Sequence, residues 1–215
     1  MTDQSEISSL LASRICHDLV SPVGAIANGA DLISEIGGGD VQDEIAMISQ
    51  SAARASALLQ FYRIAFGAAG EDDMPLARGA LRAQAEQLLA TPKMILDWEG
   101  LEGPAMSRAE GRLLFPLLMC ARPVAGMRGR ISTRLDLEAS FPQTITILSL
   151  GATPGSQSVN HDYLALLAAG PEMPAITARQ IEFAMVHRSA AELGVRIAVA
   201  GLGEGARIEA VHSSN

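Results

Sequence analysis

A histidine with an acid directly after it, His17-Asp18, is followed by Pro22 inside a segment that has helical periodicity. Neutral imidazole is a good nucleophile at neutral pH, because its unperturbed pKa lies near ~6.5. The phosphoramidate that it forms can pass the phosphoryl group on to a carboxylate. An adjacent acid can accept a hydrogen bond from one ring nitrogen and leave the other free to attack. This layout is typical of a phospho-accepting histidine, so His17 and Asp18 are the candidate catalytic residues.

The apolar residues around His17 predict a long amphipathic helix that displays the ring. They alternate steps of four and three along one seam: Ile15, Leu19, Pro22, Ile26, Gly29, Ile33 and Ile36. His17 lies two residues from the seam, which is about 200° around a helix. We therefore expect the imidazole to face solvent, and we expect Gly29 to let a second helix approach closely.

A second segment repeats this pattern after Gly37-Gly38-Gly39-Asp40, which can end one helix and begin another. Its apolar positions are Val41, Ile45, Ile48, Ala52, Ala55, Leu59, Tyr62 and Phe66. The two segments predict an antiparallel helical hairpin over residues 1–68. Further apolar side chains widen the stripe beyond one seam, with Met47, Leu58 and Phe61 as candidates for a shared core. We therefore expect a homodimer whose hairpins form a four-helix bundle.

The remainder of the chain predicts a mixed domain of helices and strands. Glycine, acids and a proline interrupt the periodicity at 69–75, which we interpret as a linker to a domain over 76–215. Helices are expected at 76–90, 107–121, 161–169 and 176–193, and strands at 94–98, 130–138, 144–149, 195–200 and 206–211. Two of the strands are expected to form a hairpin around 140–142. A helix layer on an antiparallel or mixed sheet makes the overall fold class α+β.

Composition narrows the possible functions. The formal net charge is −8 and Lys93 is the single lysine, so nucleic acid is a poor candidate partner. The first ten residues contain two acids and no basic residue, and no apolar run reaches about 18 residues without a charge or proline. A cytoplasmic location without membrane insertion is therefore expected. Cys16 and Cys120 lack metal-ligand spacing, so we expect buried free thiols and no metal site.

A histidine-bearing hairpin followed by an α/β sandwich resembles the core of a histidine kinase, in which a dimerisation domain precedes an ATP-binding domain. That family holds its nucleotide with a helix asparagine, a D-x-G-x-G loop and a G-x-G-x-G loop. Here the corresponding helix, RAEGRLLFPLLMCARPV, contains no asparagine, and D-x-G-x-G is absent from the sequence. The GLGEG motif at 201–205 lies between two predicted strands, where a hairpin turn is the expected role. We therefore expect no bound cofactor.

A kinase-like architecture with an intact histidine and missing nucleotide motifs resembles the ChpT-type histidine phosphotransferases of alphaproteobacteria. The resemblance is most specific in ICHDLVSPVGAIANGADLI at 15–33 and is supported by HRSAAELGVRIAVAGLGEGARIEA at 187–210. It implies a homodimer that relays a phosphoryl group through His17 in a two-component phosphorelay of cell-cycle control. The implied donor is the receiver domain of a CckA-like hybrid histidine kinase, and the implied acceptors are CtrA-like and CpdR-like response regulators. Mg²⁺ would come from the receiver.

The receiver is expected to dock beside His17. Pairing the two helices about the glycine turn places His17 level with about Gln60. The predicted receiver contacts surround that level: Arg14, Ser21, Gly24, Ala25, Leu59, Tyr62 and Arg63. Two alternatives remain open at this point. One is an ATP-dependent histidine kinase with a divergent nucleotide site, and the other is a non-catalytic dimeric adaptor that binds receivers.

Overall fold

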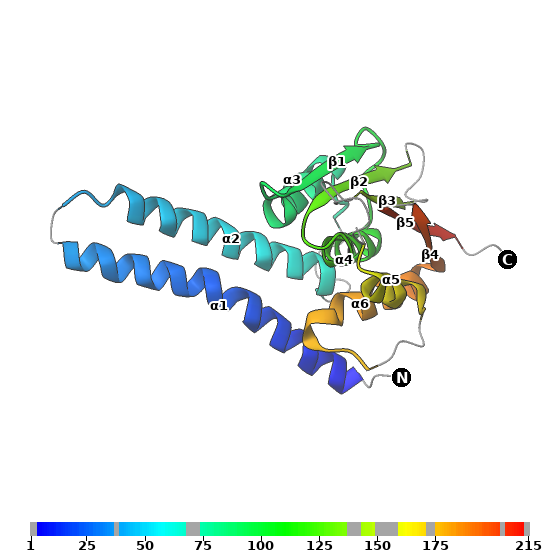
Figure 1. The fold of residues 1–215 in the computed structure, drawn as a ribbon, viewed down its shortest axis with the longest axis horizontal. Helices are drawn as coiled ribbons and strands as arrows, with labels where there is room; N and C mark the ends of the chain where they lie inside the picture. The colour runs from blue at the N-terminus through cyan, green and yellow to red at the C-terminus, as the bar shows by residue number, and fades with distance from the viewer. Residues whose placement is uncertain are drawn as a thin grey trace.

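The computed structural model describes residues 4–36, 39–67, 74–136, 143–148, 159–170, 175–202 and 205–212. Two long antiparallel helices, α1 (Gln4–Ile36) and α2 (Gln42–Phe66), project from a domain of helices and strands (Figure 1). The predicted α+β fold with an N-terminal hairpin is therefore confirmed. The domain boundaries at 68 and 76 stay a prediction, because most of the linker at 69–75 lies outside the described residues. The turn residues Gly37 and Gly38 also lie outside them.

The seam predicted for α1 is buried or half-buried from Ile15 to Ile33, but its last member, Ile36, is exposed. Gly29 is buried, and a Cβ atom at this position would lie 2.7 Å from Cγ1 of Ile48. The absence of a side chain at Gly29 therefore allows the two helices to approach closely, as predicted. Pro22 is also buried inside α1, where its ring nitrogen cannot donate a hydrogen bond to the carbonyl of Asp18.

The seam predicted for α2 was wrong at three positions. Ile45, Ala52 and Leu59 are exposed, whereas the residues immediately before them are less exposed. A helix with 3.6 residues per turn accommodates steps of three and four equally well. At the first two steps the sequence interpretation took the apolar residue over a polar neighbour, Glu44 or Ser51, and at the third step both candidates are leucines. The apolar residues at these steps are left on the outer face of the hairpin.

Leu58 and Phe61 are buried within one chain, with 4% and 0% of their surface exposed. The ring of Phe61 meets that of Phe115 edge-on, with the centroids 5.7 Å apart. Phe115 belongs to α4 (Arg108–Val124), so the C-terminal half of α2 is anchored on the second domain. The expectation that these two residues contribute to a core between copies was therefore wrong.

A five-stranded sheet forms the outer layer of the second domain. Its strands are β1 (Met94–Glu99), β2 (Gly129–Leu135), β3 (Gln143–Leu148), β4 (Val195–Leu202) and β5 (Gly205–His212), in the order β1-β2-β3-β5-β4. β1 and β2 are parallel because α4 crosses over between them, and the other neighbours are antiparallel. Leu202 pairs with Gly205, so GLGEG joins two antiparallel strands as expected. The predicted turn at 140–142 and residues 203–204 lie outside the described residues.

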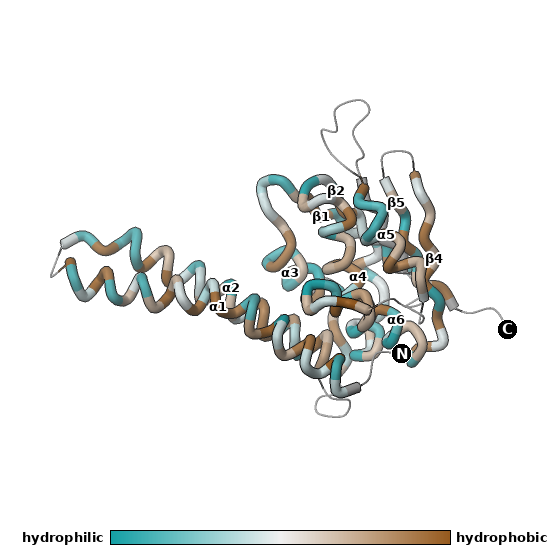
Figure 2. The backbone as a smooth tube through the Cα atoms, turned by 60° about the horizontal axis from the view of Figure 1, so that its bottom comes forward, coloured by the Kyte–Doolittle hydropathy of each residue, from teal (hydrophilic) through white to brown (hydrophobic). Residues whose placement is uncertain are grey.

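The inner layer consists of α3 (Arg78–Leu89), α4, α5 (His161–Ala168) and α6 (Ile181–Leu193), with a 3₁₀ turn, η1 (Ala178–Gln180), before α6. A capping box between Ser107 and Glu110 starts α4. α4 is the central element of this layer because it contacts α2, α3, α5 and α6. Figure 2 shows apolar and polar segments alternating along the hairpin, including its far end, where the described chain places no third element.

By length and composition alone, α1 is apolar enough to cross a membrane from Ser5 to Ile36. Helices of soluble proteins pass the same test. The apolar seam of α1 packs on α2, and Arg14 forms an ion pair with the second domain.

Candidate active site

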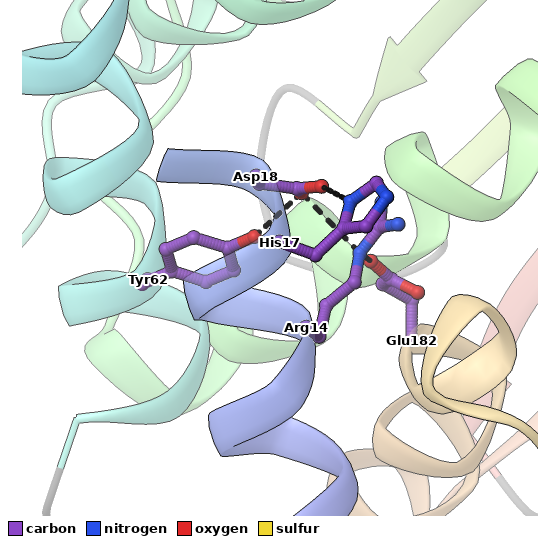
Figure 3. A network of polar contacts seen from close by, with 5 residues as sticks. All are labelled: Arg14, His17, Asp18, Tyr62 and Glu182. Carbon is purple, nitrogen blue, oxygen red and sulfur yellow. Dashed lines mark hydrogen bonds and ion pairs between the residues drawn. The ribbon is translucent and has the colours of Figure 1, made fainter. Parts of the chain in front are cut away.

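His17 lies on the exposed face of α1, with 61% of its side chain accessible, as the periodicity predicted. Its Nδ1 atom lies 3.1 Å from Oδ1 of Asp18 (Figure 3). A carboxylate can only accept, so we assign the ring proton to Nδ1 as the donor. This tautomer leaves Nε2 with a free lone pair. The ring is thus oriented with one nitrogen available for attack on phosphorus.

Asp18 is the centre of a network of contacts. The Tyr62 hydroxyl donates a hydrogen bond of 2.7 Å to Oδ2 of Asp18, and Nε of Arg14 lies 3.3 Å from the same oxygen. Both oxygens of the carboxylate are therefore used, one by His17 and the other by two partners. These contacts restrict rotation of the carboxylate and so keep Oδ1 directed at His17.

Glu182 on α6 completes this network from the second domain. Its Oε1 atom accepts a hydrogen bond of 2.9 Å from Nε of Arg14, and only 3% of the residue is exposed. Burial raises the pKa of the Glu182 carboxyl, and Arg14 partly offsets this rise. Arg14 is less deeply buried, so Glu182 and Asp18 outweigh its own desolvation and raise its pKa. The ion pair fastens α1 to α6.

Tyr62 is held in place by aromatic packing. Its ring stacks on Phe66 with centroids 5.7 Å apart and tilts against Phe61 at 5.1 Å. Burial raises the pKa of the Tyr62 hydroxyl, and the hydrogen bond to Asp18 raises it further. The hydroxyl therefore stays protonated and acts as a donor throughout the physiological range. We call the five residues of Figure 3 the carboxylate network: Arg14, His17, Asp18, Tyr62 and Glu182.

The seven residues predicted to contact a receiver fall into two groups. Arg14 and Tyr62 bind Asp18, and Tyr62 is only 6% exposed. The other five are exposed or half-buried on the hairpin: Ser21, Gly24, Ala25, Leu59 and Arg63. A Cβ atom at Gly24 would meet nothing within 4 Å. Contact of these residues with a receiver stays a prediction.

Sequence reasoning missed Glu182. The signal that could have found it is an acid at the second position of IEFAMV, a run that is otherwise apolar.

Cys120 is buried as predicted, but Cys16 is exposed because it lies one residue past the seam position Ile15. Among the described residues, no group of three or more histidine, cysteine, aspartate or glutamate side chains could hold a metal ion.

A displayed and oriented imidazole on a helical hairpin, fixed from an adjoining α/β domain, defines a histidine phosphotransfer protein. Residues 78–205 match the histidine phosphotransferase C-terminal domain family. The chain is also 34% identical over 197 residues to the protein phosphotransferase ChpT of Brucella abortus (strain 2308), covering 90% of each protein. It therefore belongs to the ChpT family of histidine phosphotransferases, as the sequence resemblance suggested.

A solved structure of a bacterial phosphotransferase supports this assignment at the level of the whole fold. It is 31% identical, covers 98% of both chains and has a TM-score of 0.75. A histidine kinase domain from Erythrobacter litoralis EL346 has a TM-score of 0.43 at 15% identity, which is too low to assign a function. The chain is thus an enzyme of phosphoryl transfer with a part in two-component signalling.

Proposed function

We propose that His17 is the residue of this phosphotransferase that becomes phosphorylated. The observation that carries the proposal is an exposed imidazole whose Nδ1 is held by Asp18, an arrangement that leaves the lone pair on Nε2. Nε2 attacks the phosphorus of an aspartyl phosphate on a receiver domain. The N–P bond forms as the P–O bond to the aspartate breaks, and the receiver's carboxylate leaves. The reverse step delivers the group to the aspartate of a second receiver.

Asp18 stabilises the charge that this step creates. When Nε2 takes the phosphoryl group while Nδ1 keeps its proton, the ring becomes positively charged. The carboxylate of Asp18, 3.1 Å from Nδ1, favours that charged form. Phosphoryl transfer also needs Mg²⁺ to neutralise the phosphoryl oxygens. We assign that ion to the carboxylates of the receiver, and we propose that this chain binds no cofactor of its own.

A homodimer is proposed from the outer face of the hairpin. Helical periodicity puts Val20 and Val23 on one side of α1 and Ile45 and Leu59 on one side of α2, and all four side chains are exposed. An apolar face of this kind favours burial against a second copy, which gives a four-helix bundle. Light scattering at micromolar concentration should give twice the chain mass of 22.5 kDa. Ile45→Asp should shift the protein to monomers, and a wild-type monomer would contradict the bundle.

The partners are proposed from the resemblance to ChpT. The donor is the receiver domain of a CckA-like hybrid histidine kinase, and the acceptors are CtrA-like and CpdR-like response regulators in a cytoplasmic cell-cycle relay. The 34% identity to the Brucella protein supports this assignment. The proposed docking face consists of four residues on the surface of the hairpin, Ser21, Gly24, Ala25 and Arg63, and Leu59 is assigned instead to the face between copies. Arg14 and Tyr62 act on His17 through Asp18.

A phosphotransfer assay tests the role of His17. The full-length protein is mixed with a phosphorylated receiver and Mg²⁺, and acid-labile label is followed on a gel. His17→Gln should lose all labelling while keeping its helical circular dichroism. His161→Gln removes another exposed histidine and is the matched control. Phosphorus NMR should place the phosphoryl group on Nε2. Labelling retained in His17→Gln would overturn the assignment.

Two further measurements, ATP binding and receiver binding, combined with the labelling assay, separate the two alternatives. Micromolar ATP affinity by calorimetry, together with labelling from ATP, would favour an ATP-dependent histidine kinase. Receiver binding without any labelling of the wild-type chain would favour a non-catalytic adaptor. Labelling by a receiver and none by ATP is the result that the proposal expects.

A further inference from the structure

A groove with a volume of about 410 Å³ opens beside Asp18, between the hairpin and the first two helices of the second domain. Three arginines line it, each from a different helix: Arg14 on α1, Arg54 on α2 and Arg122 on α4. Pro22, Leu58, Leu88 and Met119 supply apolar walls. Asp18 is the one carboxylate among the lining residues, and the carboxylate network already uses both of its oxygens. We call this feature the arginine groove.

Arg122 is the arginine of this groove that has an unpaired hydrogen-bond donor among the described residues. Its Nε atom is buried and has no hydrogen-bond partner among the described residues. Burial lowers the pKa of Arg122, the neighbouring charges of Arg54 and Arg14 lower it further, and Asp18 offsets part of this decrease. The residue as a whole is half-buried and lines the groove. A partly desolvated cation among like charges is stabilised by an anion that can accept its hydrogen bonds.

Arg54 is fixed in place but its charge is not neutralised by its contacts. Its Nη1 atom donates to the carbonyl oxygens of Leu88 at 2.8 Å and Gln87 at 3.2 Å, near the end of α3. These acceptors carry only partial charge, although the C-terminal end of a helix favours a cation. Arg14, in contrast, is paired with two carboxylates. The groove thus presents two cationic side chains, Arg54 and Arg122, that have no carboxylate partner among the described residues.

We propose that the arginine groove binds an acidic side chain presented by the docked receiver domain. This inference rests on the proposed function, because it assumes that a receiver brings its aspartate to His17. The groove shares Asp18 with the carboxylate network, so a receiver over His17 also lies over the mouth of the groove. Ser21 and Ala25 of the proposed docking face line the same groove, which makes it continuous with that face.

Charge favours an acidic group in particular. The protein as a whole has a formal net charge of −8, yet this groove gathers three arginines within reach of one another. Its apolar walls suit the methylene groups of a glutamate or aspartate, and its guanidinium groups suit the carboxylate. The contact would fix the register of the receiver on the hairpin, whereas an uncharged side chain would leave the arginines desolvated and unpaired.

The test compares Arg122→Gln and Arg54→Gln with Arg128→Gln, which removes the same charge from an exposed site outside the groove. Each full-length variant is labelled by a phosphorylated receiver with Mg²⁺ and, separately, by phosphoramidate. In each groove variant the ratio of receiver-dependent to phosphoramidate-dependent labelling should fall about tenfold. The loss should be in KM for the receiver, and the salt dependence of KM should weaken. Arg128→Gln should match the wild type.

Reversing the charge on both sides of the contact identifies the receiver side chain that binds in the groove. Arg122→Glu should abolish receiver-dependent labelling, and a receiver in which the contacting acid is replaced by lysine should restore part of it. Groove variants that behave like Arg128→Gln would overturn the proposal. So would submillimolar binding of inorganic phosphate or ATP to the wild type that is lost in Arg122→Gln, because the groove would then be a small-anion site. Failure of the proposed function has a different signature, which is no labelling of the wild type by either donor.

Discussion

Two polar clusters meet at Asp18, and they differ in how completely their members are partnered. In the carboxylate network, both oxygens of Asp18 accept hydrogen bonds and Glu182 binds Arg14. In the arginine groove, the Nε atom of Arg122 has no partner within the described part of the chain. The first cluster is preorganised before any receiver arrives, as electrostatic catalysis requires. The second cluster becomes complete only when a partner supplies an anion.

This difference predicts where substitutions act. Changes in the carboxylate network should affect the isolated protein, in its stability or its intrinsic reactivity. Changes in the arginine groove should affect the encounter with a receiver.

Glu182→Ala should lower the free energy of unfolding by about 2–4 kcal/mol. It leaves the charge of Arg14 without its buried partner, and Arg14 is partly exposed, so the effect should lie toward the lower end of that for a fully buried pair. Urea unfolding followed by circular dichroism measures the change. Glu192→Ala on the same helix breaks an exposed pair with Arg188 and is the control. Equal losses in the two variants would show that α6 does not fasten α1 through Glu182.

Asp18→Asn should slow phosphoryl transfer about tenfold, or ~1.4 kcal/mol of transition-state stabilisation. The amide keeps the shape of the carboxylate but removes the charge that faces Nδ1 of His17. Labelling by phosphoramidate reports this loss without the docking step. A rate equal to that of the wild type would show that Asp18 is an ordinary surface acid.

Tyr62→Phe should cost about 1–2 kcal/mol of stability, because it removes one hydrogen bond to a charged acceptor and keeps the ring packing. Transfer should slow by no more than about threefold, since Arg14 still holds the same oxygen of Asp18. Thermal unfolding and phosphoramidate labelling measure the two effects. A loss of rate larger than that of Asp18→Asn would instead place the hydroxyl in direct contact with the phosphoryl group.

The smallest effect on stability is expected at His187, which is buried, whereas His17 is exposed. His187 is 8% exposed, its Nε2 atom lies 2.9 Å from the Leu166 carbonyl, and burial lowers its pKa below 6.5. As the pH falls through about 6.5, the unfolded chain takes up a proton before the folded chain does. Stability is therefore present above that pH and is lost as the pH falls toward the lowered pKa.

His187→Gln should flatten the dependence of the unfolding free energy on pH below about 6.5. Urea unfolding at a series of pH values measures it. His161→Gln removes an exposed histidine and should leave the slope unchanged. An unchanged slope in His187→Gln would mean that its burial does not influence titration.

Local properties of this chain were predictable from its sequence, and contacts between distant residues were not. The display of His17 follows from helical periodicity over a few turns, and α4 begins at Arg108, one residue after the predicted helix start at 107. The inward face of α2 was misassigned because steps of three and four are equivalent until a partner helix selects one. Glu182 could not be linked to Asp18, because nothing local relates α6 to the middle of α1.

The contact between Arg14 and Glu182 joins residues that are 168 positions apart in the chain. At a synthesis rate of about 5–20 residues per second, roughly 8–34 s separate the appearance of the two residues. During that interval the nascent chain already contains His17 and Asp18 but lacks the side chain that anchors Arg14. A product that ends before α6 therefore carries the nucleophile without its supporting ion pair. Full assembly of the relay site thus depends on synthesis of nearly the whole chain.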